Sequence, residues 1–334
     1  PLKINKTMFQ DKDGNPIKFF DAVVGGKSVG TPGIPALLEK SYEKWGKLNW
    51  SLLFQDAISL SENGFEVSKK LSSSIKNSRK SLMLFPNTRE YFFSKKTALE
   101  HGDILINKKY AKTLRSFSRD GSKIFYKGYI AEDIISTVKN AKKNPGTLSY
   151  LDLLNYKIIE REPVCTSYRN HKVCGMGPPS SGALTVSQIL GIIENFNISE
   201  LGPHNSETWR IIGDASRLAF ADRSLYMADS DFIKVPIKKL IDKKYLKERA
   251  KLLTSFKKLQ LVKPGNLFTN NLSKLGEDIS IEFPSTSHIS IIDQYGNALS
   301  MTTTIENGFG SRLMTNAGFL LNNELTDFSF KTYN

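Results

Sequence analysis

The sequence is poor in the residues that hold metals and cross-links. It has two cysteines and four histidines among its 334 residues, and neither kind recurs at the short spacings of metal-binding motifs. It also lacks any apolar run of about 18 residues, the length that a transmembrane helix needs. No signal peptide is visible. We therefore expect a protein without a metal, another cofactor or a membrane-spanning helix.

Acidic residues are scarce beside basic ones, 33 against 47, which gives a net charge of +14. Such a surplus can attract nucleic acid or an anionic membrane. The lysines are scattered as pairs, such as Lys69-Lys70 and Lys243-Lys244, and no pair joins a longer block or alternates with aromatic residues. A stacking platform for nucleic acid needs that alternation. The charge pattern therefore predicts a solvated basic surface and no nucleic-acid partner.

The composition, 40% hydrophobic and 24% charged, is that of a folded protein with a buried core. From Ile34 to about Leu253 apolar residues recur mostly at helical spacing, apart from a β segment at Tyr156–Met176, and from Ile279 onward the pattern changes to strands. No repeat or low-complexity linker separates these parts, so we expect helices layered on sheet in one structural domain. The predicted helices are Trp50–Leu60, Val67–Met83, Lys109–Ser118, Ile130–Lys142, Tyr150–Leu154, Leu184–Phe196, Glu207–Tyr226 and Pro236–Leu253.

Both cysteines lie in a predicted β-hairpin that turns at Arg169-Asn170. Pairing about a two-residue turn puts Cys165 opposite Cys174 in a non-hydrogen-bonded pair, where side chains approach most closely. A disulfide is geometrically possible there in an oxidising compartment. Two buried thiols are an equally good interpretation.

A second hairpin is predicted between Ser285 and Thr304. Gly296 ends a three-residue loop with the left-handed conformation that such a loop needs, and this register pairs Asp293 with Asn297. One face is then apolar, because isoleucines on the first strand oppose Met301 and Leu299 on the second.

The other face of this hairpin carries hydroxyl groups. Thr286 lies opposite Thr304, and between them and the turn His288 and Ser290 oppose Thr302 and Ser300. Cross-strand threonine pairs are also common in ordinary sheets, so the pattern alone does not establish a catalytic site.

Further motifs follow one another in a fixed order along nearly the whole chain. They are Val29-Gly30-Thr31-Pro32-Gly33, Phe125-Tyr126-Lys127-Gly128, Pro178-Pro179-Ser180-Ser181-Gly182, Ala221-Asp222-Arg223-Ser224, Phe309-Gly310-Ser311 and the stretch from Gly318 to Phe328. Together with Thr286-Ser287-His288 and the turn after it, this order resembles the γ-glutamyltranspeptidase family of N-terminal-nucleophile hydrolases. The resemblance implies a four-layer α/β/β/α sandwich. Residues 1–285 would be the helix-rich large-subunit part, and residues 286–334 the start of the small subunit.

The resemblance also implies an activity. The precursor would cut itself between Ser285 and Thr286, and Thr286 would then be the nucleophile, oriented by Thr304. The complete protein would be a γ-glutamyl transferase or hydrolase that takes its acyl group from glutathione or another γ-glutamyl amide. A γ-glutamyl-enzyme intermediate would pass that group to water or to an amino acid or peptide. Members of the family in bacteria are commonly exported, so we expect a periplasmic or secreted protein.

Four residues near the end of the chain are the candidate substrate-binding residues. Glu324 and Asp327 match the family pair that holds the α-ammonium group of the donor, and Asn323 precedes them. A solvated acidic turn with Asn322-Asn323 as turn formers is the alternative interpretation. Glu306 departs from the family pattern, because many glutathione-cleaving members carry Asn there. A carboxylate at this position would add a ligand for the ammonium or indicate another acyl donor.

Two other functions remain open at this point. A glutaryl- or cephalosporin-type acylase would use the same Thr286 and differ at Glu306, and a non-catalytic basic binding protein would keep only the scaffold. Family members also carry paired serines and oxyanion-hole glycines that would follow Asn334, and a carboxylate-binding Arg that would precede Pro1. Since losing one oxyanion donor costs about 10²–10³ in rate, we expect the 334-residue chain alone not to turn over.

Overall fold

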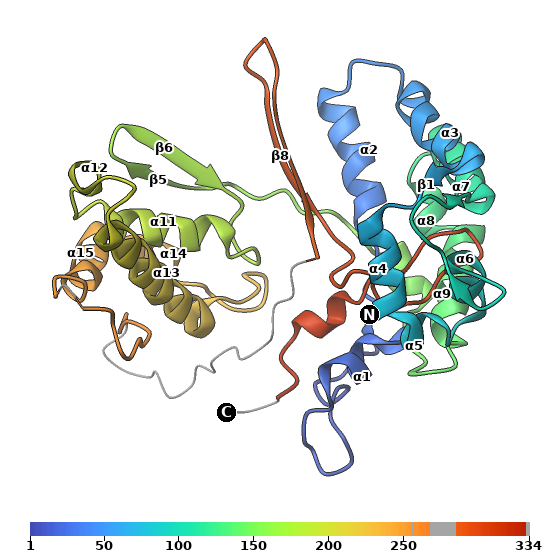
Figure 1. The fold of residues 1–334 in the computed structure, drawn as a ribbon, viewed down its shortest axis with the longest axis horizontal. Coiled ribbons are helices and arrows are strands. Elements are labelled where there is room, and N and C mark those ends of the chain that lie inside the picture. Colours follow the sequence, from blue (N-terminus) through green and yellow to red (C-terminus); the bar gives the residue numbers. More distant parts are fainter. Residues whose placement is uncertain (256, 268–284, 332–334) are drawn as a thin grey trace. The chain divides into compact units, whose positions relative to one another are not determined.

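The computed structural model describes residues 1–255, 257–267 and 285–331. These form two compact units, shown in Figure 1. Unit 1 contains Pro1–Ile158 and the described residues of Ser280–Thr332, and unit 2 contains the described residues of Ile159–Ile279. The strand pattern expected from Ile279 begins outside the described residues, and the first described strand after it starts at Ser287.

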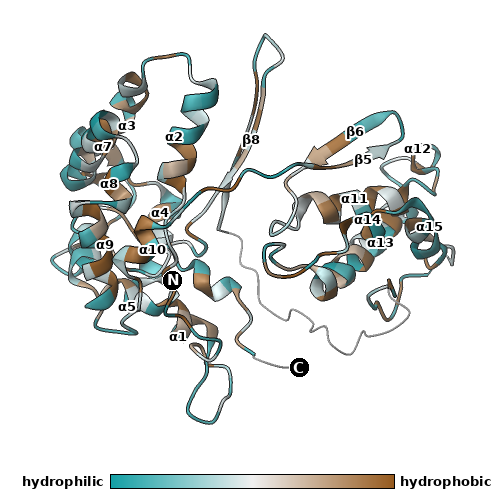
Figure 2. Cartoon of the chain, turned by 180° about the vertical axis from the view of Figure 1, so that it is seen from behind, coloured by the Kyte–Doolittle hydropathy of each residue, from teal (hydrophilic) through white to brown (hydrophobic). Residues whose placement is uncertain are grey.

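Unit 1 is mainly helical, and its helices are amphipathic, as the alternating colours of α7 and α9 in Figure 2 show. Apolar side chains on one face of each helix meet in shared clusters around Ile130, Ile134 and Leu148, which are fully buried. The helices are α1 (Phe19–Val23), α2 (Ile34–Trp45), α3 (Gln55–Asn63), α4 (Lys69–Asn77), α5 (Arg79–Leu82), α6 (Pro86–Phe92), α7 (Lys108–Asp120), α8 (Lys123–Tyr126), α9 (Tyr129–Lys139) and α10 (Tyr150–Leu154), with 3-10 turns at η1 (Gly26–Ser28), η2 (Trp50–Phe54) and η4 (Glu324–Asp327).

Side chains at the helix ends explain why several helices begin and end where they do. The Asn107 side chain accepts a hydrogen bond from the Tyr110 backbone N–H, which caps α7, and Gly121 ends that helix at φ 74°. Ser149 and Asp152 form a reciprocal capping box at the start of α10.

The C-terminal segment after the second hairpin packs into the helical core of unit 1. Leu313 and Leu321 are buried among helix side chains from the first half of the chain. The segment runs past the helices without a long strand, so side chains satisfy its backbone groups. Thr88 Oγ1 donates to the Arg312 carbonyl at 2.6 Å, and Thr113 Oγ1 donates to the Ala317 carbonyl at 2.8 Å. The segment is therefore fixed to the helices on which the site depends.

Unit 2 is built from a hairpin and a group of helices. Apolar residues of α11, α13 and α15, such as Ile192, Leu218 and Leu246, form its main core. Its elements are β5 (Val164–Tyr168), β6 (His171–Gly175), α11 (Gly182–Ile193), α12 (Ile198–Leu201), α13 (Ser206–Tyr226), α14 (Ile237–Leu240) and α15 (Lys243–Lys251).

A buried charged network lies within unit 2. The Asp222 carboxylate, 1% exposed, accepts hydrogen bonds from Gln188, Tyr245, Arg249 and the Gly265 backbone N–H. Four donors replace the water that this carboxylate lost on burial. The network also holds the segment around Gly265 against α13 and α15.

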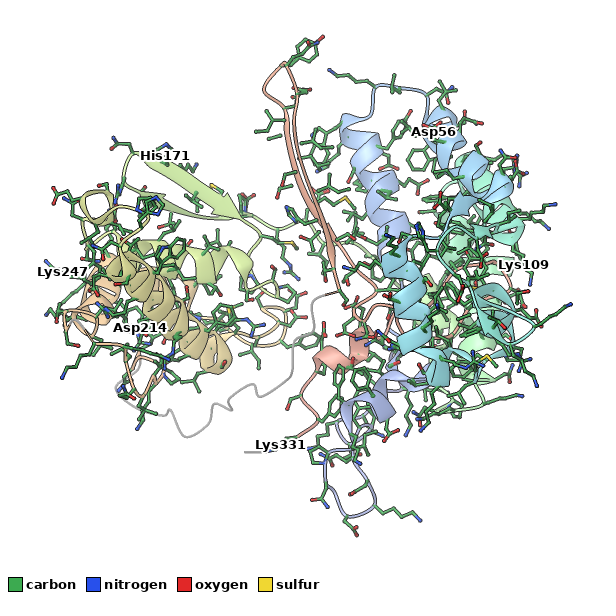
Figure 3. The ribbon with its side chains drawn as sticks, viewed as in Figure 1. Asp56, Lys109, His171, Asp214, Lys247 and Lys331 are labelled. Atoms are coloured by element: carbon green, nitrogen blue, oxygen red, sulfur yellow. A yellow bond between two sulfur atoms is a disulfide. The ribbon has the colours of Figure 1, made fainter. Side chains whose placement is uncertain are left out.

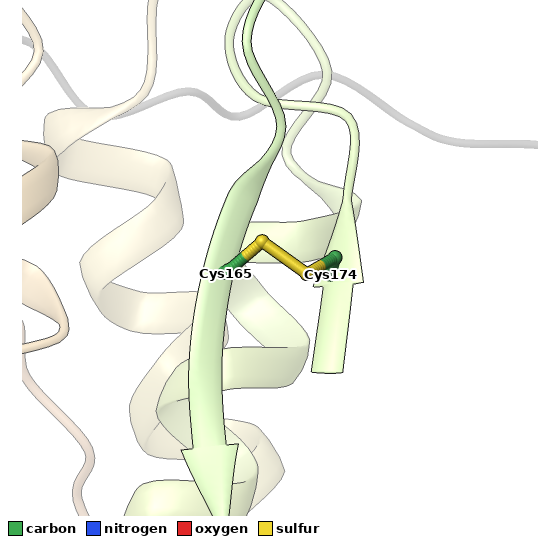
Figure 4. Close-up of a disulfide and its surroundings, with 2 residues drawn as sticks. All are labelled: Cys165 and Cys174. Carbon is green, nitrogen blue, oxygen red and sulfur yellow. A yellow bond between two sulfur atoms is a disulfide. The ribbon is translucent and has the colours of Figure 1, made fainter. Parts of the chain in front are cut away.

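The first predicted hairpin forms as β5 and β6. Cys165 pairs with Cys174 in the expected register, and their Cα atoms lie 4.1 Å apart. Figure 4 shows the disulfide that joins the two strands. Of the two interpretations of the cysteine pair, a disulfide or two buried thiols, the structure contains the disulfide.

The strands of the described residues pair as four antiparallel two-stranded sheets. Two of these sheets are two-residue pairs in unit 1, in which β1 (Phe65–Glu66) pairs with β4 (Ile104–Leu105) and β2 (Phe93–Ser94) with β3 (Thr97–Ala98). The longest sheet joins β7 (Ser287–Ile292) to β8 (Ala298–Thr303).

Three predicted helices are each divided. The helix predicted at Trp50–Leu60 forms as the 3-10 turn η2 followed by α3. The helix predicted at Val67–Met83 breaks at Ser78, which lies at φ −95° and ψ 7° between α4 and α5, where Asn77 and Ser78 are weak helix formers. The helix predicted at Pro236–Leu253 breaks at Asp242, whose side chain accepts from the Tyr245 N–H and so begins α15 anew. Over the described ranges, no helix has both the length and the apolarity to cross a membrane.

Candidate active site

The second hairpin brings the two candidate catalytic threonines together. His288 pairs with Thr302 and Ile291 with Leu299, which is the predicted register, and Gly296 turns the chain at φ 81°. One step beyond the ladder, Thr286 Oγ1 donates to Thr304 Oγ1 at 3.2 Å. Thr286 is exposed, so its hydroxyl is accessible to a reacting group.

Thr304 is held by the chain that follows it. The Glu306 backbone N–H donates to Thr304 Oγ1 at 2.8 Å. Ser285, the residue before Thr286, donates its hydroxyl hydrogen bond to the Glu306 carbonyl. The backbone of Glu306 therefore contacts Ser285, on the N-terminal side of the Ser285–Thr286 bond, and Thr304, the hydrogen-bond partner of Thr286. Glu306 itself lies at φ 70°, a left-handed conformation that few non-glycine residues adopt.

The side chain of Glu306 turns toward η4. Asn323, which is fully buried, donates from Nδ2 to the Glu306 carboxylate and to Thr326 Oγ1. Its Oδ1 accepts from the Asn307 backbone N–H at 3.0 Å. The amide group of Asn323 is thus hydrogen-bonded within the protein, and it fixes the position of the Glu306 side chain.

Three carboxyl groups meet at this point. Burial, the negative charges of Asp327 and Glu306 and a hydrogen bond to Asp327 together raise the pKa of Glu324 to about 7, and burial is the largest of these causes. Burial likewise raises the pKa of Glu306, partly opposed by the hydrogen bond from Asn323. Carboxyl groups whose protonated forms are favoured in this way are suited to receive a cation.

Arg312 is a charged residue of the site that the sequence analysis did not identify. It is 4% exposed, its guanidinium donates to Asn307 Oδ1 at 2.6 Å and to the Gly310 carbonyl, and burial lowers its pKa to about 10. The positive charge that remains at neutral pH favours the ionised form of Glu306. The motif Phe309-Gly310-Ser311, directly before Arg312, was the feature of the sequence that could have drawn attention to it. The motif does not show, however, that the side chain of the next residue is buried.

Asn322 connects the site to the beginning of the chain. Its Oδ1 accepts from the Gly30 N–H at 2.9 Å and its Nδ2 donates to the Gly30 carbonyl at 3.0 Å. The same Oδ1 accepts from the Glu324 N–H. These two hydrogen bonds bring together two of the motifs found in the sequence, although Gly30 and Asn322 are 292 residues apart. The alternative role of Asn322 as a simple turn former overlooks this connection.

The hydroxyl face of the hairpin continues away from Thr286. His288 contacts Thr302 through Nδ1 at 2.8 Å, and its Nε2 lies 3.1 Å from Ser290 and 3.2 Å from Ser300. The opposite face, expected to be apolar, carries Ile289 and Ile291 and is about half exposed. Among the residues that the structure describes, no group of His, Cys, Asp and Glu has an arrangement that could hold a metal ion.

Comparison with known proteins places this geometry in a family. The family model described as Gamma-glutamyltranspeptidase matches residues 1–334. The chain is 34% identical to the glutathione hydrolase proenzyme of Escherichia coli, over 99% of this chain and 55% of the relative. It is 32% identical to the acylase ACY 1 proenzyme of a Pseudomonas species, over 92% of this chain and 52% of that protein.

A solved structure agrees with this assignment. The γ-glutamyltranspeptidase of Helicobacter pylori superposes with a TM-score of 0.76 at 36% identity, over 81% of this chain and 78% of that one. The predicted α/β fold class of N-terminal-nucleophile hydrolases is thereby confirmed. The chain spans a little over half the length of the curated relatives named above. The family model and the relatives together show that this chain belongs to the γ-glutamyltranspeptidase family.

Proposed function

We propose that the complete protein is a self-processing γ-glutamyl transferase or hydrolase that acts on glutathione or another γ-glutamyl amide. The observation that carries the proposal is the hydroxyl pair of Thr286 and Thr304 joined, through Glu306, to a cluster of carboxyl groups. One end of this arrangement supplies a nucleophile and the other end supplies a site for an ammonium group.

Self-processing begins at the Ser285–Thr286 peptide bond. Thr286 Oγ attacks the Ser285 carbonyl carbon, the C–N bond breaks, and the departing nitrogen takes up a proton. The resulting ester is hydrolysed by water, which leaves a carboxylate on Ser285 and restores the Thr286 hydroxyl. The products are the large subunit, which includes residues 1–285, and a small subunit that begins at Thr286.

The α-amine exposed by this cleavage then serves as the base. Its reference pKa of about 7.7–8.0 leaves a basic fraction near neutral pH. It accepts the Thr286 hydroxyl proton as Oγ attacks the γ-carbonyl carbon of the donor, and it returns a proton to the departing amine. Water or the amine of an amino acid or peptide then releases the γ-glutamyl group. In the uncleaved chain Thr304 Oγ1 lies 3.2 Å from Thr286 Oγ, and this contact holds Oγ in position; once the amine takes the Thr286 proton, the Thr304 hydroxyl can donate to Oγ in turn.

The carboxyl cluster supports a γ-glutamyl donor. Glu324 and Asp327 bind the α-ammonium group of that donor, and Glu306 adds a third carboxylate that Asn323 holds in place. Charge-assisted hydrogen bonds of this kind fix which end of the donor faces the nucleophile. A glutaryl donor lacks the ammonium group and would leave three carboxyl groups without a cation.

A glutaryl-type acylase is the second candidate, since a Pseudomonas acylase proenzyme is among the relatives. Substrate comparison separates the two. For the full-length protein we expect a higher kcat/KM on a γ-glutamyl anilide than on the matching glutaryl anilide. Losing a charged hydrogen bond costs about 1.5–3 kcal/mol, so Asp327→Asn should lower kcat/KM for the γ-glutamyl substrate roughly ten- to a hundredfold and affect the glutaryl substrate much less.

The exposed Asp56→Asn provides a matched control, because Asp56 lies on α3 outside the site. Mass spectrometry of the same preparations should find a fragment that begins with Thr286 in the native protein and none in Thr286→Ala. An active but uncut protein would overturn the mechanism, and a native preference for the glutaryl anilide would favour the acylase.

We also propose that the protein is exported to the periplasm or secreted. The Cys165–Cys174 bridge supports this location, because disulfides persist mainly in oxidising compartments. Thiol alkylation of the protein in fractionated cells tests it. Both cysteines should resist alkylation until a reductant is added, and the protein should appear outside the cytoplasmic fraction.

A further inference from the structure

Arg312 is buried in unit 1 with its charge incompletely satisfied. Its guanidinium donates to two uncharged acceptors, the side-chain carbonyl of Asn307 and the backbone carbonyl of Gly310. Within the described part of the chain, its Nε is buried and has no hydrogen-bond partner. A buried charge that is only partly paired destabilises a protein, so the presence of an arginine at this position needs an explanation other than packing.

The backbone of Arg312 is unusual as well. It lies at φ 65°, in the left-handed region that few non-glycine residues adopt. Glu306 lies at φ 70° and Gly310 at φ 52°, so the short segment 306–312 takes this conformation three times. Residues held in such sparsely populated conformations are often found at functional sites, where the surrounding contacts keep them in place.

Contacts with a helix and with the preceding turn fix the backbone of Arg312. Thr88 Oγ1, on α6, donates to the Arg312 carbonyl at 2.6 Å and accepts from the Met314 N–H at 3.2 Å. The Arg312 N–H donates to the Phe309 carbonyl at 2.9 Å. The guanidinium therefore extends from a part of the main chain that is anchored to a helix.

The guanidinium closes the turn that follows Glu306. Asn307 Oδ1 accepts from Arg312 at 2.6 Å, and the Asn307 carbonyl accepts from the Gly310 N–H at 2.6 Å. The Asn307 N–H donates to Asn323 Oδ1 at 3.0 Å. Asn323 in turn donates to the Glu306 carboxylate. A continuous set of hydrogen bonds thus leads from the guanidinium to that carboxylate.

The charge of Arg312 acts on the same carboxylate. Burial raises the pKa of Glu306 and the charge of Asp327 raises it further, whereas the hydrogen bond from Asn323 and the charge of Arg312 lower it. The pKa of Glu324, by contrast, is raised by burial and by the two neighbouring carboxyl groups. Within the carboxyl cluster, Arg312 therefore favours the ionised form of Glu306.

We propose that Arg312 is a positioning residue that determines donor preference, because it keeps the Glu306 carboxylate ionised and in place beside Glu324 and Asp327. Arg312 acts through Glu306, which is the residue that meets the α-ammonium group of the donor. Without the guanidinium, a third carboxyl group in this cluster would take up a proton and offer the ammonium group a weaker, uncharged hydrogen bond. This inference rests on the proposed γ-glutamyl function and adds that Glu306 and Arg312 work as a pair.

Donor preference of the processed, full-length protein tests the pair. The preference is the ratio of kcat/KM for a γ-glutamyl anilide to kcat/KM for the matching glutaryl anilide, so damage that affects both substrates equally cancels. Arg312→Met keeps a long side chain but removes the charge and the donors. We expect it to lower the ratio about tenfold, since a charged hydrogen bond to the ammonium group becomes a neutral one. In a Glu306→Gln background the same substitution should change the ratio less than about twofold, because the two residues act together.

Two further variants separate charge, geometry and folding. Lys109→Met removes one positive charge from an exposed side chain of α7, labelled in Figure 3, and should leave the ratio unchanged. Arg312→Lys keeps a cation but cannot donate to Asn307 and Gly310 in the same way, so its ratio should lie between those of the native protein and Arg312→Met. If Arg312→Met does not fold, Arg312→Lys decides the question: its ratio should be lowered in the native background and unaltered in the Glu306→Gln background.

The possible failures of this inference and of the proposed function can be told apart. A ratio that stays at the native value in both Arg312 variants, or that falls equally in the two backgrounds, would overturn the role of Arg312 and leave the γ-glutamyl function standing. A native preference for the glutaryl anilide would overturn the proposed function and the inference with it. Mass spectrometry of every variant should find the fragment that begins with Thr286, which shows that the proteins compared are processed.

Discussion

Glu324 is partly buried beside two other carboxyl groups, and in the proposed enzyme this position would couple its charge to the binding of a donor. With a pKa of about 7, it is mostly protonated and neutral below that pH and mostly ionised above it. Only the ionised form attracts an ammonium group. Affinity for a ligand with an α-ammonium should therefore rise as the pH rises through about 7.

Competitive inhibition by L-glutamate measures this effect in the processed, full-length protein. The inhibition constant should fall as the pH increases from about 6 to 8, because the ligand keeps its ammonium charge over that range while Glu324 loses its proton. Glutarate, which has no ammonium group, should not gain affinity. In Glu324→Gln the pH dependence for L-glutamate should disappear. A dependence that survives in this variant would assign the titration to another group, with the Thr286 α-amine the first to examine.

At the scale of secondary structure elements, the local features were predictable from the sequence. The register of β7 and β8 follows from a short loop, the glycine at its end and alternating polarity. The β5–β6 register follows in the same way. Helix breaks at Ser78 and Asp242 were missed, because the apolar spacing continues across them while the backbone is diverted by local caps.

Contacts between distant segments were not predictable in this way. Arg312 and Asn322 reach the candidate site because the C-terminal segment packs among helices of the first half of the chain. The sequence around Arg312 and around Asn322 contains no local pattern that would tell whether their side chains are buried or exposed. The resemblance to a family predicted Thr304, Glu324 and Asp327 as site residues, and that remains a prediction. The contact of Asn323 with Glu306 could be found only from the fold.

The buried network of unit 2 gives a prediction about its stability. Asp222 balances the buried Arg249 and accepts three other hydrogen bonds. Asp222→Asn leaves the arginine charge without its counter-ion, and breaking a buried pair in this way costs about 3–5 kcal/mol. The free energy of unfolding from urea titration should fall by an amount of that order. Asp120→Asn, which removes an exposed ion pair with Arg119, should leave it nearly unchanged, and equal losses in the two variants would argue against the network.

At the scale of the whole molecule, the proposed cleavage leaves two polypeptides that share one core. Leu313 and Leu321, on the C-terminal side of the cut, are buried among helices from the N-terminal side. The Asn322–Gly30 hydrogen bonds and the Thr88–Arg312 hydrogen bond join the same two sides. The fragments should therefore elute as one species in size-exclusion chromatography of the native protein and separate only in denaturant. Separate elution without denaturant would show that these contacts do not hold the cleaved protein together.

Glu306 combines two tasks in different parts of one residue. Its backbone N–H and carbonyl contact Thr304 and Ser285, whereas its side chain faces Asn323 and the carboxyl cluster. In the proposed enzyme, a change of side chain at this position would alter donor preference while the main chain continues to support Thr286 as the nucleophile. Its φ of 70° narrows the choice of replacement, since asparagine and glycine tolerate that conformation better than most residues. A mutation in one codon could therefore change which donor is preferred without changing the reaction, which would give this scaffold a short evolutionary route to new substrates.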